Sequence, residues 1–293
     1  MEPQCRGLED AALRALVFGG TGLLGTEVVR AARQRGAAAL GLSSRQADLR
    51  DPQRLIDHVE AFRPDLVVNC AAFTAVDDCE SREAEALAIN GDAVAHAVAA
   101  ARHLEAPLVQ ISTDYVFPGD DEGPYAPDAA TGPRSAYGRT KLVGEQRALD
   151  YEHSLVLRIS WVFGAAGANF VATMVRLMEG GAPELRVVDD QLGAPTYAPF
   201  AARAILDLAS AGARGLYHYQ NREPVTWYGF AQEIAREVAP QIPLHPVTTD
   251  AFPRPAPRPA NSVLDVSATE ALLGRPVETW RSGLAQYLAQ RSR

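Results

Sequence analysis

The chain has 293 residues, of which 47% are hydrophobic and 22% are charged, and its formal net charge at pH 7 is −8. This composition is typical of a globular protein, and the acidic balance argues against a nucleic-acid-binding protein, which needs a basic surface. The sequence holds no apolar run of the roughly 18 residues that a membrane-spanning helix requires, so we expect neither a nucleic acid nor a membrane as a partner.

The cysteines and histidines give no sign of a metal centre. Cys5, Cys70 and Cys79 form no C-x-x-C pair, and the six histidines show no metal-ligand spacing. The amino-terminal stretch "MEPQCRGLEDAALRA" mixes charges and lacks the apolar segment of a secretory signal. An odd number of cysteines without such a signal predicts a cytoplasmic protein.

Short apolar segments alternate with helical patterns through the first half of the chain. In chain order, strands are expected at 15–18, 37–42, 65–70, 107–112 and 154–160, and helices at 23–36, 51–64, 81–105 and 137–149. Apolar strands that alternate with helices indicate parallel βαβ units with helices on both faces of the sheet. We therefore predict an α/β fold built on a doubly wound parallel sheet.

The pattern is looser after about residue 160. Single strands are expected at 215–220 and 262–266, a helix at 226–238, and a loop in the proline-rich stretch 252–262. We predict a dinucleotide-binding domain at 1–160. Residues 161–293 should form mainly a smaller, mixed α/β substrate-binding lobe that is interleaved with the first domain.

The stretch "FGGTGLLG" follows a predicted strand and opens a predicted helix. Alone, a glycine-rich turn is a weak signal, but this context is typical of dinucleotide-binding sites. Gly19 would permit the tight turn, Gly22 would let the backbone approach a pyrophosphate, and Gly25 would let helix and strand pack closely. The phosphates would then lie at the helix N-terminus, where amide groups and the helix dipole favour negative charge.

The end of the second strand bears on the choice of cofactor. The stretch "LGLSSRQADL" lacks the acidic residue that would bind the ribose 2′-hydroxyl of NAD, and Arg45 could accept a 2′-phosphate instead. NADPH is therefore favoured and NADH remains compatible; the alternative is that Arg45 is a solvated surface residue. Near the adenine and at the end of the next strand, the expected cofactor contacts are Asp48, Leu49, Ala71 and Ala72.

A tyrosine and a lysine stand four positions apart in "SAYGRTKLVGEQ". Residues with this spacing are neighbours on one face of a helix, so Tyr137 and Lys141 could act on the same small molecule. The alternative is an exposed pair without a function.

The glycine loop, "STDYVF" (112–117) and Tyr137-x-x-x-Lys141, in this order, resemble the extended short-chain dehydrogenase/reductases. The later segments "DDQLGAPT" and "RPANS" are similar to the dTDP-4-dehydrorhamnose reductase family, and the similarity runs from about Leu16 to Leu288. This resemblance implies a Rossmann-type fold. The implied activity is the NAD(P)H-dependent reduction of the 4-keto group of dTDP-4-dehydro-6-deoxy-L-mannose, a nucleotide sugar, to dTDP-L-rhamnose.

The resemblance also implies roles for particular residues. Tyr137 would be the general acid, Lys141 would hold the nicotinamide ribose and tune the tyrosine, and Thr113 would hold the reacting oxygen of the substrate. Positions that match cofactor contacts are Gly22, Leu23, Leu24, Asp48, Leu49, Ala72, Phe73 and Thr74. Positions expected around the substrate are Thr113, Asp114, Tyr115 and Trp161, together with Arg258 for the diphosphate.

A free phenol, with a pKa near 10, is a weak acid at pH 7. Lowering that pKa by about three units takes roughly 4 kcal/mol, which one cation at about 4 Å supplies at an effective dielectric constant near 20. We therefore expect Lys141, helped by the positive charge of an oxidised nicotinamide, to lower the pKa of Tyr137.

Some members of the family bind magnesium through glutamates at a dimer contact. Glu27 fits one such position, but Pro199 stands where another glutamate is expected, so we expect no metal. A homodimer is compatible with the resemblance.

Two alternatives remain open. The chain could reduce or epimerise another nucleotide-linked keto sugar with the same catalytic residues. It also resembles a non-catalytic cofactor-binding protein, the regulatory β subunit of methionine adenosyltransferase, although Trp161 favours an enzyme.

Overall fold

The computed structural model of the protein describes residues 13–291. Cys5 and most of the amino-terminal stretch that was examined for a secretory signal lie outside the described residues. Within 13–291, no helix is both long and apolar enough to cross a membrane.

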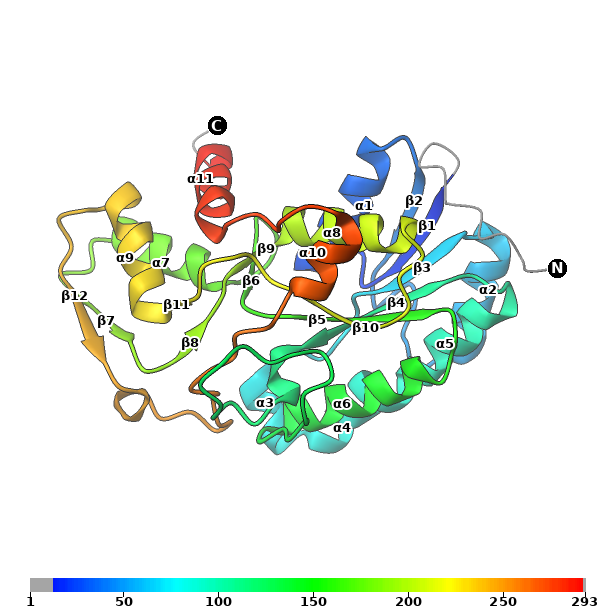
Figure 1. The fold of residues 1–293 in the computed structure, drawn as a ribbon, viewed down its shortest axis with the longest axis horizontal. Coiled ribbons are helices and arrows are strands. Elements are labelled where there is room, and N and C mark those ends of the chain that lie inside the picture. Colours follow the sequence, from blue (N-terminus) through cyan, green and yellow to red (C-terminus); the bar gives the residue numbers. More distant parts are fainter. Residues whose placement is uncertain (1–12, 292–293) are drawn as a thin grey trace.

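A six-stranded parallel sheet forms the centre of the larger part of the molecule (Figure 1). Its strand order is β2-β1-β3-β4-β5-β10, so the order reverses between β1 and β3. A cleft for ligands is expected outside the carboxyl ends of the strands at such a reversal. The strands are β1 (Arg14–Phe18), β2 (Ala38–Leu42), β3 (Leu66–Asn69), β4 (Leu108–Thr113), β5 (Ser154–Ile159) and β10 (Gly215–Tyr219).

Helices cover both faces of this sheet, which confirms the predicted fold class. Successive side chains of a strand point to opposite faces. Accordingly Val17 of β1 lies in one core with residues of α1 (Leu23–Gln34) and α8 (Ala198–Ser210). Its neighbour Phe18 lies in a second core with residues of α2 (Pro52–Phe62), α5 (Ala93–His103) and α6 (Ala136–Leu149).

Local capping fixes where the helices begin. Asp51 accepts a hydrogen bond from the backbone N–H of Arg54, and Pro52 occupies the first position of α2. Ser135 caps α6 by accepting from the N–H of Gly138 at 3.1 Å. Because α6 begins at this cap, Tyr137 lies in its first turn and Lys141 one turn later.

The helix expected at 81–105 runs from Glu83 to His103, but it contains a wider π-helical turn, and a short helix precedes it. The chain forms α3 (Val76–Ser81), α4 (Glu83–Leu87), a wider π-helical turn (Ala88–Asp92) and then α5. In the π-helical turn, buried Asn90 accepts from the N–H of Phe73 at 2.7 Å and donates to the carbonyl of Phe73 at 3.1 Å. The wide turn thereby ties the helix to the loop that follows β3.

A smaller lobe lies to the left in Figure 1 and is built from short elements. Its strand pairs are β7 (Leu185–Val188) with β12 (Leu244–Val247), β8 (Leu192–Gly193) with β11 (Val225–Thr226), and β6 (Val162–Phe163) with β9 (Thr196–Tyr197). Its longer helices are α7 (Phe170–Glu179) and α9 (Trp227–Val238). The chain ends with α10 (Ser267–Leu273) and α11 (Trp280–Arg291). The strand β10 joins the large sheet, and residues of α8 share a core with its strands, so parts of 161–293 pack with the first part of the chain. The domain boundary at residue 160 stays a prediction.

The strand expected at 262–266 is wrong. Leu264 makes only an isolated bridge with Tyr125. The side chain of Gln220 takes both backbone groups of Leu264, accepting from its N–H at 3.1 Å and donating to its carbonyl at 2.9 Å. With its polar groups occupied in this way, the segment does not extend a strand ladder.

Candidate active site

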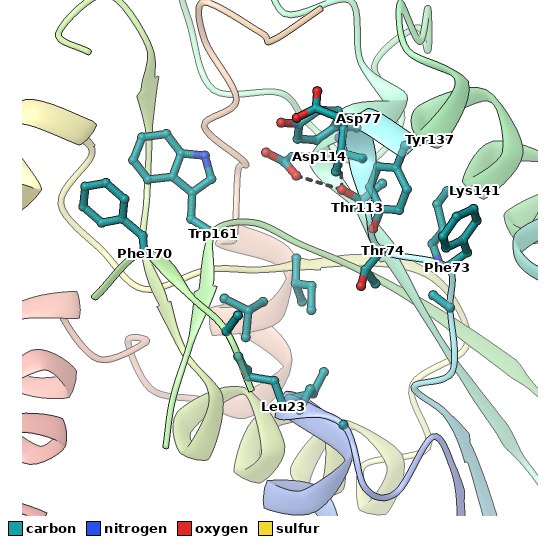
Figure 2. Close-up of a pocket in the computed structure, with 18 of the residues that line it drawn as sticks. Leu23, Phe73, Thr74, Asp77, Thr113, Asp114, Tyr137, Lys141, Trp161 and Phe170 are labelled. Carbon is teal, nitrogen blue, oxygen red and sulfur yellow. Dashed lines mark hydrogen bonds between the residues drawn. The ribbon is translucent and has the colours of Figure 1, made fainter. Parts of the chain in front are cut away.

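One large cavity lies along the carboxyl ends of the sheet strands and extends into the smaller lobe; Figure 2 shows part of its lining. Its volume is about 1320 Å³. A pocket for a single drug-sized ligand measures roughly 300–1,000 Å³. The cavity therefore has room for two ligands side by side.

The glycine turn forms one end of the cavity. Gly19 has φ +71°, and a Cβ there would lie 2.6 Å from the backbone nitrogen of Ala71, so only glycine fits. Gly25 does not line the cavity, and a Cβ on it would lie 2.2 Å from the carbonyl oxygen of Gly19. Gly22 lines the cavity and precedes α1, whose first turn has no side-chain cap. The free amide groups of that turn suit the pyrophosphate of a dinucleotide.

The lining next to the glycine turn contains most of the expected cofactor contacts. Arg45, which was expected at a 2′-phosphate, is exposed and is not part of the lining. Arg50 lines the cavity instead and pairs with Asp48 at 2.6 Å. Its hydrogen bond lowers the pKa of the Asp48 carboxyl. The other expected residues that line this end are Leu23, Leu24, Leu49, Ala71, Ala72, Phe73 and Thr74.

Tyr137 and Lys141 both face the cavity from α6 (Figure 2). Lys141 is only 4% exposed, and its Nζ donates to the carbonyl oxygen of Ile111 at 2.6 Å. Burial lowers the pKa of this ammonium to about 8. Tyr137 is partly buried, and its ring lies edge-on to that of Tyr115.

The expected acidic phenol is not present in the protein alone, so that expectation was wrong for the free protein. Burial, followed by the negative charge of Asp114, raises the pKa of Tyr137 above its usual value of 10. The nearby Thr113 hydroxyl lowers the pKa but does not outweigh burial. The spacing of Tyr137 and Lys141 places the two groups correctly, but desolvation dominates the electrostatics.

Thr113 and Asp114 stand together at the end of β4. The hydroxyl of Thr113 donates to Oδ1 of Asp114 at 2.9 Å and accepts from the N–H of Tyr115 at 3.3 Å. Burial raises the pKa of the Asp114 carboxyl to about 6. Thr113, Asp114 and Tyr115 all line the cavity, next to Tyr137.

An aromatic wall of the cavity is formed by Trp161, Trp227 and Phe170. The indoles of Trp161 and Trp227 stack with ring centroids 3.4 Å apart and planes at 5°. Trp161 has φ +45°, a strained conformation for a bulky residue. Gly193 makes room for its indole, because a Cβ there would lie 2.4 Å from the ring. Trp227 was missed from the sequence, although its place at the start of the expected helix 226–238 was a signal.

Arg258 lines the cavity from the proline-rich loop and is bound to protein groups. It donates to Asp77 at 2.9 Å and to the carbonyl of Ala256 at 2.8 Å. Arg254, 3.9 Å from Asp77, and Arg186 of β7 also line the cavity. Three arginines that line one cavity suit the diphosphate of a nucleotide. Sequence reasoning named only Arg258, because Asp77 and Arg186 come from distant segments.

Within residues 13–291, no group of three or more His, Cys, Asp or Glu side chains could hold a metal ion. Glu27 is buried on α1, with Arg30 3.5 Å away. The expected absence of a metal stays a prediction.

Comparison with known proteins gives consistent matches along the chain. The model of the RmlD substrate binding domain family matches residues 13–293. A dTDP-4-dehydrorhamnose reductase of Streptomyces griseus is 41% identical over 281 residues, 93% of this chain and 92% of that protein. A protein of Streptomyces antibioticus named probable dTDP-4,6-dihydroxy-2-methyloxan-3-one 4-ketoreductase is 43% identical over 94% of each chain. The crystal structure of dTDP-4-dehydrorhamnose reductase from Bacillus anthracis in complex with NADP has a TM-score of 0.91 at 30% identity, covering 95% of this chain and 99% of that chain.

Experiment can distinguish the roles of Arg45 and Arg50 in cofactor binding. We expect Arg50→Ala to raise the dissociation constant for NADPH several-fold and to leave that for NADH nearly unchanged. The guanidinium has five donors and can serve Asp48 and a 2′-phosphate together. Arg45→Ala is the matched control and should change neither constant much, as measured by fluorescence titration. A selective loss of NADPH binding in Arg45→Ala alone would favour Arg45 instead.

The buried Lys141 ammonium should make the folded protein less stable. We expect Lys141→Met to raise the free energy of unfolding at pH 7 by on the order of 2 kcal/mol, because native burial disfavours the charge. The ordinary pKa is 10.5 and the native value is about 8, so the unfolded chain binds this proton more tightly. As the pH rises from about 8 to 10.5, the free energy of unfolding of the wild type should therefore increase relative to that of the variant. Urea unfolding at several pH values measures the difference, and a variant less stable at pH 7 would contradict the account.

Proposed function

The chain belongs to the RmlD substrate binding domain family, and from this premise we propose that it uses NADPH to reduce the 4-keto group of dTDP-4-dehydro-6-deoxy-L-mannose to dTDP-L-rhamnose. The observation that carries the proposal is the shared cavity. The glycine turn, Tyr137, Lys141 and the three arginines all line one space.

The chemistry that bound NADPH supplies is hydride transfer to the carbonyl carbon. Negative charge then develops on the carbonyl oxygen, and the hydroxyl of Tyr137 gives that oxygen its proton. Thr113 holds the same oxygen, and its hydrogen bond strengthens as charge develops. Both side chains face the cavity from adjoining elements, the start of α6 and the end of β4.

The positive charge of Lys141 would balance the negative charge that is left on Tyr137 when its proton leaves. An ammonium has three N–H donors, and one of them is taken by the carbonyl of Ile111. Two donors remain for a ribose hydroxyl and for the side of the phenol. With a pKa of about 8, most Lys141 side chains are charged at pH 7. This charge and that of an oxidised nicotinamide together oppose the burial that makes the free phenol a poor acid.

The remaining expected residues would hold the sugar nucleotide. Asp114 and Tyr115 adjoin the reacting end, and Trp161 supplies an apolar wall beside it. Arg258 would meet the diphosphate with Arg254 and Arg186, after exchanging part of its contact with Asp77 for the phosphate oxygens. A homodimer and a cytoplasmic location, both expected from the sequence, stay predictions.

A second candidate is the reduction of a different dTDP-linked keto sugar. The 43% identity to the Streptomyces antibioticus protein supports it, because that protein's name gives a different 4-keto substrate. Tyr137, Lys141 and Thr113 would act identically on either sugar. The non-catalytic alternative lacks such support, since the relatives reported above carry the names of reductases.

We expect the purified protein to oxidise NADPH in the presence of dTDP-4-dehydro-6-deoxy-L-mannose, followed by the loss of nicotinamide absorbance. Tyr137→Phe should lower kcat by roughly 10²-fold or more, because general acid catalysis is worth about 10²–10⁴-fold. The variant should still bind NADPH, which serves as its control for folding. A panel of keto-sugar nucleotides tests the choice of substrate. Near-normal turnover by Tyr137→Phe would remove the phenol from the mechanism.

A further inference from the structure

The Thr113 hydroxyl has one proton, and two groups require it. A hydroxyl donates only one hydrogen bond. In the structure that bond goes to Oδ1 of Asp114 at 2.9 Å. To hold the reacting oxygen as charge develops, Thr113 must donate to the substrate instead. The site as it stands therefore keeps Thr113 occupied by a neighbouring carboxyl group.

The Asp114 carboxyl has a hydrogen-bond partner for only one of its two side-chain oxygens among residues 13–291. Its side chain lies at the end of β4, is 3% exposed and lines the cavity. Figure 2 shows the bond from Thr113 to one oxygen of this carboxyl. The other oxygen, Oδ2, is buried and has no hydrogen-bond partner among residues 13–291. The hydroxyl of Ser262 and the backbone N–H groups of Asp114 and Tyr115 are close enough to lower the pKa of Asp114, but the Ser262 hydroxyl donates to the carbonyl of Leu192 at 3.5 Å.

No cation in the described part of the chain forms an ion pair with Asp114. Arg258, on the proline-rich loop, is bound to Asp77 of α3. Lys141, on α6, donates to the carbonyl of Ile111. Two phenols interact with the charge of Asp114, Tyr115 beside it in the chain and Tyr137 on α6; burial raises the pKa of both, and the charge of Asp114 raises it further.

We propose that Asp114 takes up one proton when the nucleotide sugar binds, and that as a neutral carboxylic acid it donates from Oδ2 to an oxygen of the sugar and releases the Thr113 hydroxyl for the reacting oxygen. The inference rests on the proposed function and deepens it. The proton comes from the solvent, and no bond other than O–H forms. Neutral Asp114 also removes the negative charge that opposes ionisation of Tyr137.

Burial already favours this neutral form, with a pKa of about 6 for the Asp114 carboxyl. A sugar that fills the cavity removes the remaining water, which raises the pKa of a carboxyl further. At pH 7 the free protein holds this proton in roughly a tenth of its molecules, so binding should take up about 0.9 proton. A buried carboxylic acid that stays neutral in order to donate a hydrogen bond is an established catalytic device.

The experiment is calorimetric titration of the NADP⁺ complex with dTDP-L-rhamnose at pH 7, in buffers of different ionisation enthalpy. We expect wild type to take up about 0.9 proton per site. Asp114→Asn should bind dTDP-L-rhamnose with almost no uptake. Asp77→Asn removes a different carboxyl from the same cavity and should keep the uptake.

Steady-state kinetics supply a second readout. Between pH 6.5 and 7.5, KM for the sugar nucleotide should rise up to about ten-fold in wild type, while kcat stays constant. In Asp114→Asn this dependence of KM should vanish, and retained NADPH binding shows that the variant is folded. Binding of dTDP-L-rhamnose without proton uptake, or uptake that persists in Asp114→Asn, would overturn the role of Asp114 alone. Failure of the sugar nucleotide to bind would overturn the proposed function, and this inference with it.

Discussion

The Lys141 ammonium lines the cavity and is held by one hydrogen bond to the carbonyl of Ile111. Because β4 supplies the carbonyl and α6 supplies the lysine, the position of α6 against the sheet decides where this charge lies. Two glycines allow α6 to pack that closely. A Cβ on Gly138 would lie 2.1 Å from the carbonyl oxygen of Tyr115, and one on Gly144 would lie 2.1 Å from that of Asn90. The helix that carries Tyr137 and Lys141 is therefore packed against backbone along its length.

A buried ion pair holds α6 one turn beyond Lys141. Glu145 of α6 and Arg158 of β5 form a two-point contact at 2.8 and 2.7 Å, with side chains only 2% and 4% exposed. Such pairs contribute little net stability but fix geometry, since either partner alone would be an uncompensated buried charge. The negative charge of Glu145 also opposes the loss of the Lys141 proton. The same ion pair thus holds α6 in place and favours the charged form of the lysine.

The parts that sequence reasoning predicted are those that depend on local pattern. Buried parallel strands read as apolar runs, and the glycine turn and the Tyr137–Lys141 spacing are local as well. Long-range contacts were not predicted. The side chain of Gln220 forms hydrogen bonds with the backbone of Leu264, and Asp77 accepts a hydrogen bond from Arg258, which is distant in the chain. The pKa of Tyr137 was misjudged because it depends on burial and on Asp114, which spacing does not reveal.

The central claim is that Lys141, a desolvated ammonium, lines the same cavity as Tyr137, the proposed general acid. Lys141 is the only lysine in the chain, so protein labelled with ¹³C at lysine Cε gives a single lysine signal whose titration reports this group alone. The account predicts a pKa of about 8 for this signal in the cofactor-free protein. A value near 10.5, that of a solvated lysine, would contradict it.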